Sequence, residues 1–212
     1  MVVGAAVNRW SLSVREGGTR CGWLRWTLSA IVLGMTFAAL AERYGLGLEL
    51  VELWSFSAVL LTLSLTDIDS YRIPNACVAC ALGIRLVYLA MCCATGAMGW
   101  LDVRFYLLSA MGVGAALAGI VVVCDMLLGA ESMGGGDLKL FVVAAFYVGW
   151  AQCVLLVLVA CVLGIISSPL FRKAGGETGS AKPFPFGPSI ALACVLTMLY
   201  GEQLVTWYGG LL

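Results

Sequence analysis

The chain lacks histidine and is poor in charge, since only 11% of its 212 residues are Asp, Glu, Lys or Arg. Without histidine, Ser-His and Cys-His nucleophile pairs, histidine general bases and histidine-containing metal sites are excluded. The formal net charge is zero, so the sequence has no basic footprint for a nucleic-acid partner.

Cysteine is abundant, but its spacing does not indicate a disulfide or metal framework. Nine cysteines are present, most of them inside apolar runs, and Cys77-x-x-Cys80 has no second pair at zinc-ribbon spacing. Thiols in such surroundings act as small apolar side chains. We therefore predict no disulfide, no metal site and no cofactor.

The abundant residues are apolar, at 62% of the chain, and the mean hydropathy is +1.01. A soluble domain has about 25% charged residues, so most of this chain must face lipid or other membrane helices. The sequence predicts an all-α, polytopic membrane bundle of six to seven transmembrane helices. A bilayer core of about 30 Å needs roughly 20 apolar residues per helix. The candidate spans are residues 23–41, 51–66, 76–95, 105–128, 138–149, 151–170 and 187–206.

Lysine and arginine indicate the orientation of these spans. With a cytoplasmic N-terminus, the outer loops contain only Arg43 and Arg104. The inner loops then contain Arg9, Arg15, Arg20, Arg25, Arg72, Lys139, Arg172, Lys173 and Lys182. This bias follows the positive-inside rule and predicts a multi-pass membrane protein whose N-terminus lies in the cytoplasm. Residues 1–22 form a basic cytoplasmic segment, and residues 23–212 form one membrane domain.

The first span has a second interpretation, because Ala39-Leu40-Ala41 could be the cleavage site of a signal peptide. The lead of 22 residues is long for a signal peptide, and Arg25 interrupts its apolar stretch. We favour an uncleaved helix. Cleavage would leave six spans in the same orientation.

The first polar motif lies between the second and third spans. Asp67 ends an apolar run, and Ile73-Pro74-Asn75 opens the next. The proline disfavours helix at the preceding residue and suits the first turn of the following helix. A carboxylate at this depth is costly without a function or a partner. For Asp69, in contrast, we expect an ordinary interfacial acid.

Two further motifs precede the fifth and last spans. Gly134 and Gly136 lead to Asp137, and glycine permits a second backbone, such as a substrate strand, to approach closely. The alternative is a flexible loop that ends in an N-cap aspartate. The third motif is Pro185-Phe186-Gly187-Pro188, in a proline-rich stretch that we expect not to form regular helix. It either presents an extended surface to a substrate or is a stiff loop.

These three motifs, in this order and spacing, resemble those of the type IV prepilin peptidase family of GxGD aspartyl proteases. The resemblance covers roughly residues 50–205 and includes Lys139, in the Asp-Leu-Lys-Leu continuation of the second motif. It implies that Asp67 and Asp137 are the catalytic pair and that the other motif residues support the substrate. The implied partner is a prepilin or pseudopilin, with a basic leader and an apolar helix, that is cut at the cytoplasmic face of the lipid bilayer.

Two nearby carboxyls share a proton, because both cannot ionise cheaply. The ionised one activates water, and the protonated one donates to the developing oxyanion. Asp67 ends a predicted helix and Asp137 begins one, so the helix dipoles predict that Asp67 carries the proton. Many family members carry paired CxxC motifs in an N-terminal domain linked to methylation. This chain is similar to the short forms without that domain, so methyltransferase activity is not implied.

Two other functions remain open. A proton-coupled transporter or channel also uses intramembrane aspartates, but it predicts an inverted repeat that is not evident. In a non-catalytic scaffold, neither aspartate would matter. A presenilin-like protease shares the chemistry, although Ile73-Pro74-Asn75 favours the prepilin type. The sequence makes no prediction of oligomeric state.

Overall fold

The computed structural model describes residues 23–129, 132–174 and 185–210, so the predicted basic segment 1–22 lies outside the described residues. In the described part, every regular element is a helix. The helices are α2 (Trp23–Tyr44), α3 (Leu48–Ser70), α4 (Asn75–Ala94), α5 (Trp100–Leu128), α6 (Gly135–Val148), α7 (Trp150–Ala174) and α8 (Gly187–Gly209). Each of the seven candidate segments corresponds to one of them, so the all-α prediction is confirmed.

Five helices, α3, α4, α5, α7 and α8, are long and apolar enough to cross a membrane. The short α6 has 14 residues, which gives a length of about 21 Å at 1.5 Å per residue. That is less than the roughly 30 Å of a bilayer core. The shortness of α6 becomes important below, because it carries one of the two candidate aspartates.

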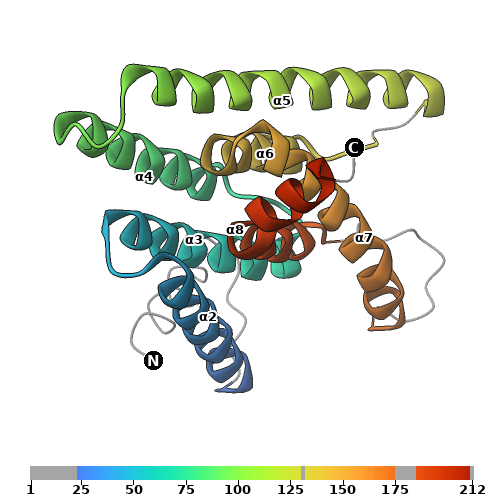
Figure 1. Ribbon diagram of the computed structural model, residues 1–212. Helices are drawn as coiled ribbons and strands as arrows, with labels where there is room; N and C mark the ends of the chain where they lie inside the picture. The colour runs from blue at the N-terminus through green and yellow to red at the C-terminus, as the bar shows by residue number, and fades with distance from the viewer. Residues whose placement is uncertain (1–22, 130–131, 175–184, 211–212) are drawn as a thin grey trace.

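The helices form a bundle in which α6 is central (Figure 1). It contacts α4, α5, α7 and α8, while α3 packs against α2, α4 and α8. The main core joins side chains from α3, α6, α7 and α8, among them Phe56, Phe141, Leu156 and Ile190, each at most 1% exposed. The chain therefore encloses a helix that is itself too short to span.

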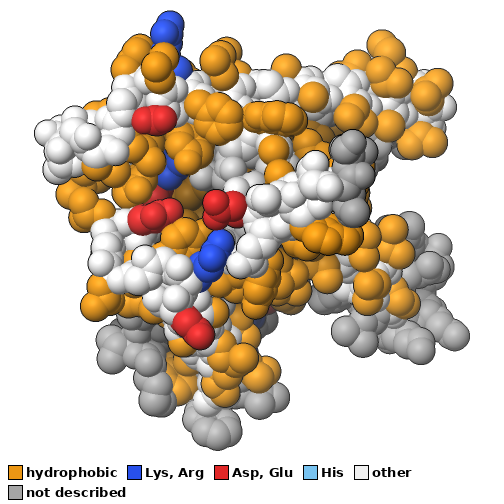
Figure 2. All heavy atoms as spheres, in the orientation of Figure 1, with side chains coloured by type: hydrophobic (Ala, Val, Ile, Leu, Met, Phe, Trp, Pro, Cys, Tyr) orange, Lys and Arg blue, Asp and Glu red, His pale blue; other side chains and the backbone are white. Residues whose placement is uncertain are grey.

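The apolar helices differ in how much of their length is buried within the protein. In α3, 56% of the most apolar window is buried within the protein, whereas in α5 only 11% is. Apolar side chains dominate the face seen in Figure 2, and charged side chains occupy a few small clusters. A helix that is apolar all round but largely exposed is suited to a lipid environment. The structure therefore agrees with a polytopic membrane bundle.

Candidate active site

Asp67 lies in the last turn of α3 and is only 5% exposed. Its Oδ2 accepts a hydrogen bond of 2.7 Å from the backbone N–H of Gly187, the first residue of α8. The carboxylate thus lies at the N-terminus of α8, where free backbone N–H groups and the helix dipole stabilise negative charge. Asp67 ends one helix and binds the beginning of another.

Gly187 permits this contact because it has no side chain. A Cβ placed on it would lie 2.8 Å from Oδ2 of Asp67 and 3.0 Å from Cβ of Asp67. Pro188 follows in the first turn of α8, where its missing N–H costs little. The expectation that this stretch forms no regular helix is therefore wrong for Gly187 and Pro188. Before them, Pro185 is buried, and Phe186 packs 6.4 Å from Phe141 of α6, measured between ring centroids.

Asp137 is the third residue of α6 and is half-buried. Gly134 is the N-cap residue, so the alternative in which Asp137 is an ordinary N-cap is wrong. Burial and, to a lesser extent, the negative charge of Asp67 raise the pKa of Asp137 from 3.8 to about 6. The two carboxyls, 70 positions apart in the sequence, are therefore close enough to influence each other.

The first and second motifs contact each other directly. A Cβ on Gly136 would lie 2.9 Å from Cβ of Ile73, so the space left by this glycine is filled by the protein itself. This corrects the interpretation that Gly136 clears room for a substrate strand. Lys139 Nζ donates a hydrogen bond of 3.1 Å to Oδ1 of Asn75, the first residue of α4. These contacts hold the N-termini of α4 and α6 side by side.

The chain turns sharply between Asp67 and Ile73. Tyr71 adopts a left-handed conformation with φ of 52° and caps α3 by donating its N–H to the carbonyl of Asp67 at 2.8 Å. Pro74, with φ of −66°, is the N-cap of α4. Such left-handed caps commonly end helices, although usually with glycine. The turn thus ends α3 and leads directly into α4.

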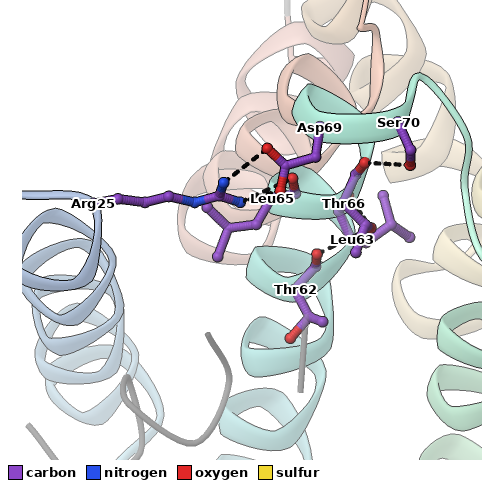
Figure 3. A network of polar contacts seen from close by, with 7 residues as sticks. All are labelled: Arg25, Thr62, Leu63, Leu65, Thr66, Asp69 and Ser70. Atoms are coloured by element: carbon purple, nitrogen blue, oxygen red, sulfur yellow. Dashed lines mark hydrogen bonds and ion pairs between the residues drawn. The ribbon is translucent and has the colours of Figure 1, made fainter. Parts of the chain in front are cut away.

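Asp69 does not behave as the ordinary interfacial acid expected from the sequence. Arg25 of α2 donates to both of its oxygens, at 2.7 and 2.6 Å, and also to the carbonyl of Leu65 at 3.1 Å (Figure 3). Two parallel N–H···O bonds make this a bidentate ion pair, the strong form of arginine–carboxylate contact. It fixes the last turn of α3, which carries Asp67, to α2.

The structure thus gathers Asp67, the Ile73-Pro74-Asn75 turn, the α6 N-terminus and the α8 N-terminus at one end of the bundle. Sequence reasoning did not find the contact between Gly187 and Asp67 or the pair between Arg25 and Asp69, since each joins distant segments. Among the described residues, no group of three or more Cys, Asp or Glu side chains gathers to hold a metal ion.

Fold and site together define an α-helical membrane protein with two interacting carboxyls at one end of its bundle. The chain belongs to the type IV leader peptidase family, whose model matches residues 54–168. It is thus a multi-pass membrane protein of a peptidase family, as the resemblance predicted. The match includes both aspartates and ends before α8.

The chain is also similar to the prepilin leader peptidase/N-methyltransferase of Bacillus subtilis (strain 168). The two are 29% identical over 178 residues, which cover 84% of this chain and 67% of that protein. No solved structure matches the chain significantly.

Proposed function

We propose that this protein is an aspartyl endopeptidase of the membrane that removes basic leader peptides from prepilin-like substrates, with Asp67 and Asp137 as its catalytic pair. One observation carries the proposal. Two carboxyls from separate helices lie at one end of the bundle, where burial and, to a lesser extent, the charge of Asp67 raise the pKa of Asp137. Coupling of this kind is what a pair that shares a proton requires. Membership of a leader peptidase family supports the same chemistry.

The surroundings of the two carboxyls favour different roles. The N–H of Gly187 and the N-terminus of α8 stabilise the anion of Asp67. Asp137 holds its proton to higher pH than an ordinary aspartate, mainly because it is buried. We therefore assign Asp67 as the base and Asp137 as the acid. This reverses the assignment from helix ends, because the sequence does not reveal that α8 begins beside Asp67.

In this mechanism, Asp67 accepts a proton from a water molecule, and the water oxygen attacks the scissile carbonyl carbon. Asp137 donates its proton to the carbonyl oxygen, which limits the developing negative charge. The tetrahedral intermediate then collapses as the C–N bond breaks. The amine leaves with the proton held by Asp67, and the hydroxyl proton returns to Asp137. Both carboxyls regain their starting states without any other reactant.

The remaining motif residues have supporting roles in the proposal. Ile73 against Gly136 and Asn75 bound to Lys139 fix the distance between α4 and α6. Pro185 and Phe186 lead into α8 and set the position of Gly187. Gly134 is exposed, and a Cβ on it would lie 3.1 Å from Oδ2 of Asp137, so a substrate backbone that approached Gly134 would also approach that carboxyl. The site is thus held by helix ends that pack against one another.

The substrate and the side of the membrane follow from charge. The excess of lysine and arginine in alternate loops favours a cytoplasmic site in a prokaryotic inner membrane. A substrate with a basic leader and an apolar helix would then present the junction between them at this membrane face. Cleavage at that junction requires water near a helix end, and both aspartates lie in terminal turns of their helices.

Cleavage by the purified protein in liposomes tests this function. The substrate is a synthetic peptide with a basic leader and an apolar helix. Because each carboxyl transfers a proton, Asp67→Asn and Asp137→Asn should each lower kcat by about 10²–10⁴-fold. Asp102→Asn is the matched control, since Asp102 caps the N-terminus of α5 through the N–H of Gly99. Either active-site variant cleaving at the wild-type rate would refute the proposal. Aspartate-dependent proton flux without cleavage would favour the transporter.

A further inference from the structure

A second group of buried charges lies at the other end of α6. Arg85 of α4 and Glu52 of α3 are each only 4% exposed. Nη1 of Arg85 donates to both Glu52 oxygens, at 2.9 and 3.1 Å. An ion pair inside a membrane bundle is expensive to form and very expensive to break, because one charge is then left uncompensated. Its position therefore requires an explanation beyond helix packing.

The other donors of Arg85 bind the C-terminus of α6. Nε donates to the carbonyl of Phe146 at 2.9 Å, and Nη2 donates to the carbonyl of Tyr147 at 3.3 Å. These carbonyls are among the last four of α6, which ends at Val148 and so leaves them without helical partners. A cation at this end also complements the helix dipole. Arg85 is thus a C-terminal cap supplied by another helix.

Aromatic rings complete this docking site. The guanidinium carbon of Arg85 lies 4.4 Å from the ring centroid of Tyr106 in α5 and 5.2 Å from that of Tyr147 in α6. The Tyr147 ring stacks on Phe56 of α3, and its hydroxyl donates to the carbonyl of Ala81 in α4 at 2.7 Å. Cation–π contacts of this kind are stronger when water is excluded from them. The last turn of α6 is therefore fixed to three neighbouring helices.

The geometry of α6 connects this end to the aspartates. Tyr147 is ten residues from Asp137, or about 15 Å along a helix. A slip of one residue at the docked end would move Asp137 along the helix axis by about 1.5 Å and turn it by about 100°. A displacement of about 1 Å in a catalytic group costs on the order of 10²-fold in rate. Contacts at the C-terminus of α6 would therefore set the position of Asp137 at its N-terminus.

We propose that Arg85 is a positioning residue that docks the C-terminal end of α6 and thereby holds Asp137 at its working distance from Asp67. The proposal rests on the proposed function for its rate effect, but not for the placement of Asp137. Glu52 orients and neutralises the guanidinium. The hydrogen bonds from Arg85 to the carbonyls of Phe146 and Tyr147 hold α6 in position.

The decisive variant replaces the ion pair with apolar residues, Glu52→Leu together with Arg85→Met. Such replacements of buried pairs often leave a protein as stable or more stable, so the variant is expected to fold. It nevertheless removes both bonds to the α6 carbonyls. We expect thermal stability in detergent near that of wild type, kcat about 10–100-fold lower and KM within about twofold. A stable variant with wild-type kcat would overturn the proposal.

Two further measurements separate positioning from other causes. The protonated-carboxyl infrared band, assigned with Asp137→Asn, should titrate at lower pH in the double variant, because Asp137 moves away from Asp67. This readout needs no substrate, so it tests the placement of Asp137 even if no peptide is cleaved. An unchanged titration would overturn the proposal. Glu52→Gln keeps Arg85 and its carbonyl bonds but leaves the guanidinium without its counter-charge, so it should lower stability and still keep the wild-type titration of the folded protein. A titration shift as large as that of the double variant would also count against the proposal.

Discussion

The two ends of α6 bury carboxylates in opposite ways. At the C-terminal end, Glu52 is matched by Arg85, whose donors also bind two carbonyls. At the N-terminal end, the described residues provide Asp67 with one backbone N–H and provide neither aspartate with an ion-pair partner. The Glu52–Arg85 cluster, in which each charged group has partners, suits a structural role. The two aspartates have few partners, which suits groups that exchange protons in the proposed mechanism. One short helix therefore joins a region built for stability to a region suited to chemistry.

The two ends of α6 should differ most in stability when a charged side chain is removed from each. Arg85→Ala leaves the Glu52 carboxylate buried without its partner and should lower the free energy of unfolding by about 3–5 kcal/mol. Asp137→Asn removes a carboxyl that burial already disfavours as an anion, so stability should change little or increase. Chemical denaturation in detergent measures both. Equal destabilisation by the two variants would contradict the division between the ends.

Gly187→Ala should separate the contact at Asp67 from general packing of α8. The added methyl group would lie 2.8 Å from Oδ2 of Asp67, so the carboxylate must move away from the helix N-terminus. We expect kcat to fall about 10²-fold. Gly209→Ala is the matched control, because a Cβ on that glycine of the same helix meets nothing within 4 Å. Similar activity of the two variants would show that the contact is unimportant.

The pH dependence of stability should report on the N-terminal end of α6, because Asp137 lies there. Its pKa is raised from 3.8 to about 6 in the folded protein, so the folded state binds this proton more tightly than the unfolded state does. The contribution of Asp137 to stability should therefore fall as pH rises from about 4 to about 6, and stay constant above. Melting temperatures across this range measure the effect. Asp137→Asn should remove this part of the change in melting temperature with pH. An unchanged pH dependence in the variant would argue against the raised pKa of Asp137.

In the proposed mechanism, the same proton sets the activity profile. Asp137 must be protonated to donate, so kcat/KM should decline as pH rises through about 6 in the free enzyme. A profile that rises across this range would reverse the assigned roles of the two aspartates.

The smallest effect is expected at Lys139. Its hydrogen bond to Asn75 is exposed, so Lys139→Met should cost no more than about 0.5 kcal/mol, the lower limit for a single hydrogen bond. Lys139→Arg, which keeps a donor and the charge, is the control. Chemical denaturation and kcat measure the result. A loss of activity comparable to that of Gly187→Ala would mean that Lys139 takes part in the chemistry.

The sequence predicted the helices well because apolar runs of membrane length have few alternatives. It also selected Asp67 and Asp137, since both interrupt apolar runs within motifs of fixed spacing. It did not predict the partners. Arg85 lies within the third predicted span, and its partner Glu52 is 33 residues away, so no local sequence pattern indicates the pair. The proposed assignment of the proton differs from the sequence-based one for the same reason, because Gly187 of α8 is 120 residues from Asp67.

The length of α6 has a consequence for hydration. A helix of about 21 Å cannot reach both surfaces of a bilayer core of about 30 Å. About 9 Å of the core thickness is therefore not spanned by α6. Arg85 already binds the carbonyls at the C-terminal end of α6, so uncovered depth at the N-terminal end would bring water toward Asp137. In the proposed mechanism, the water for hydrolysis then needs to reach only one end of α6 and does not have to cross the bundle.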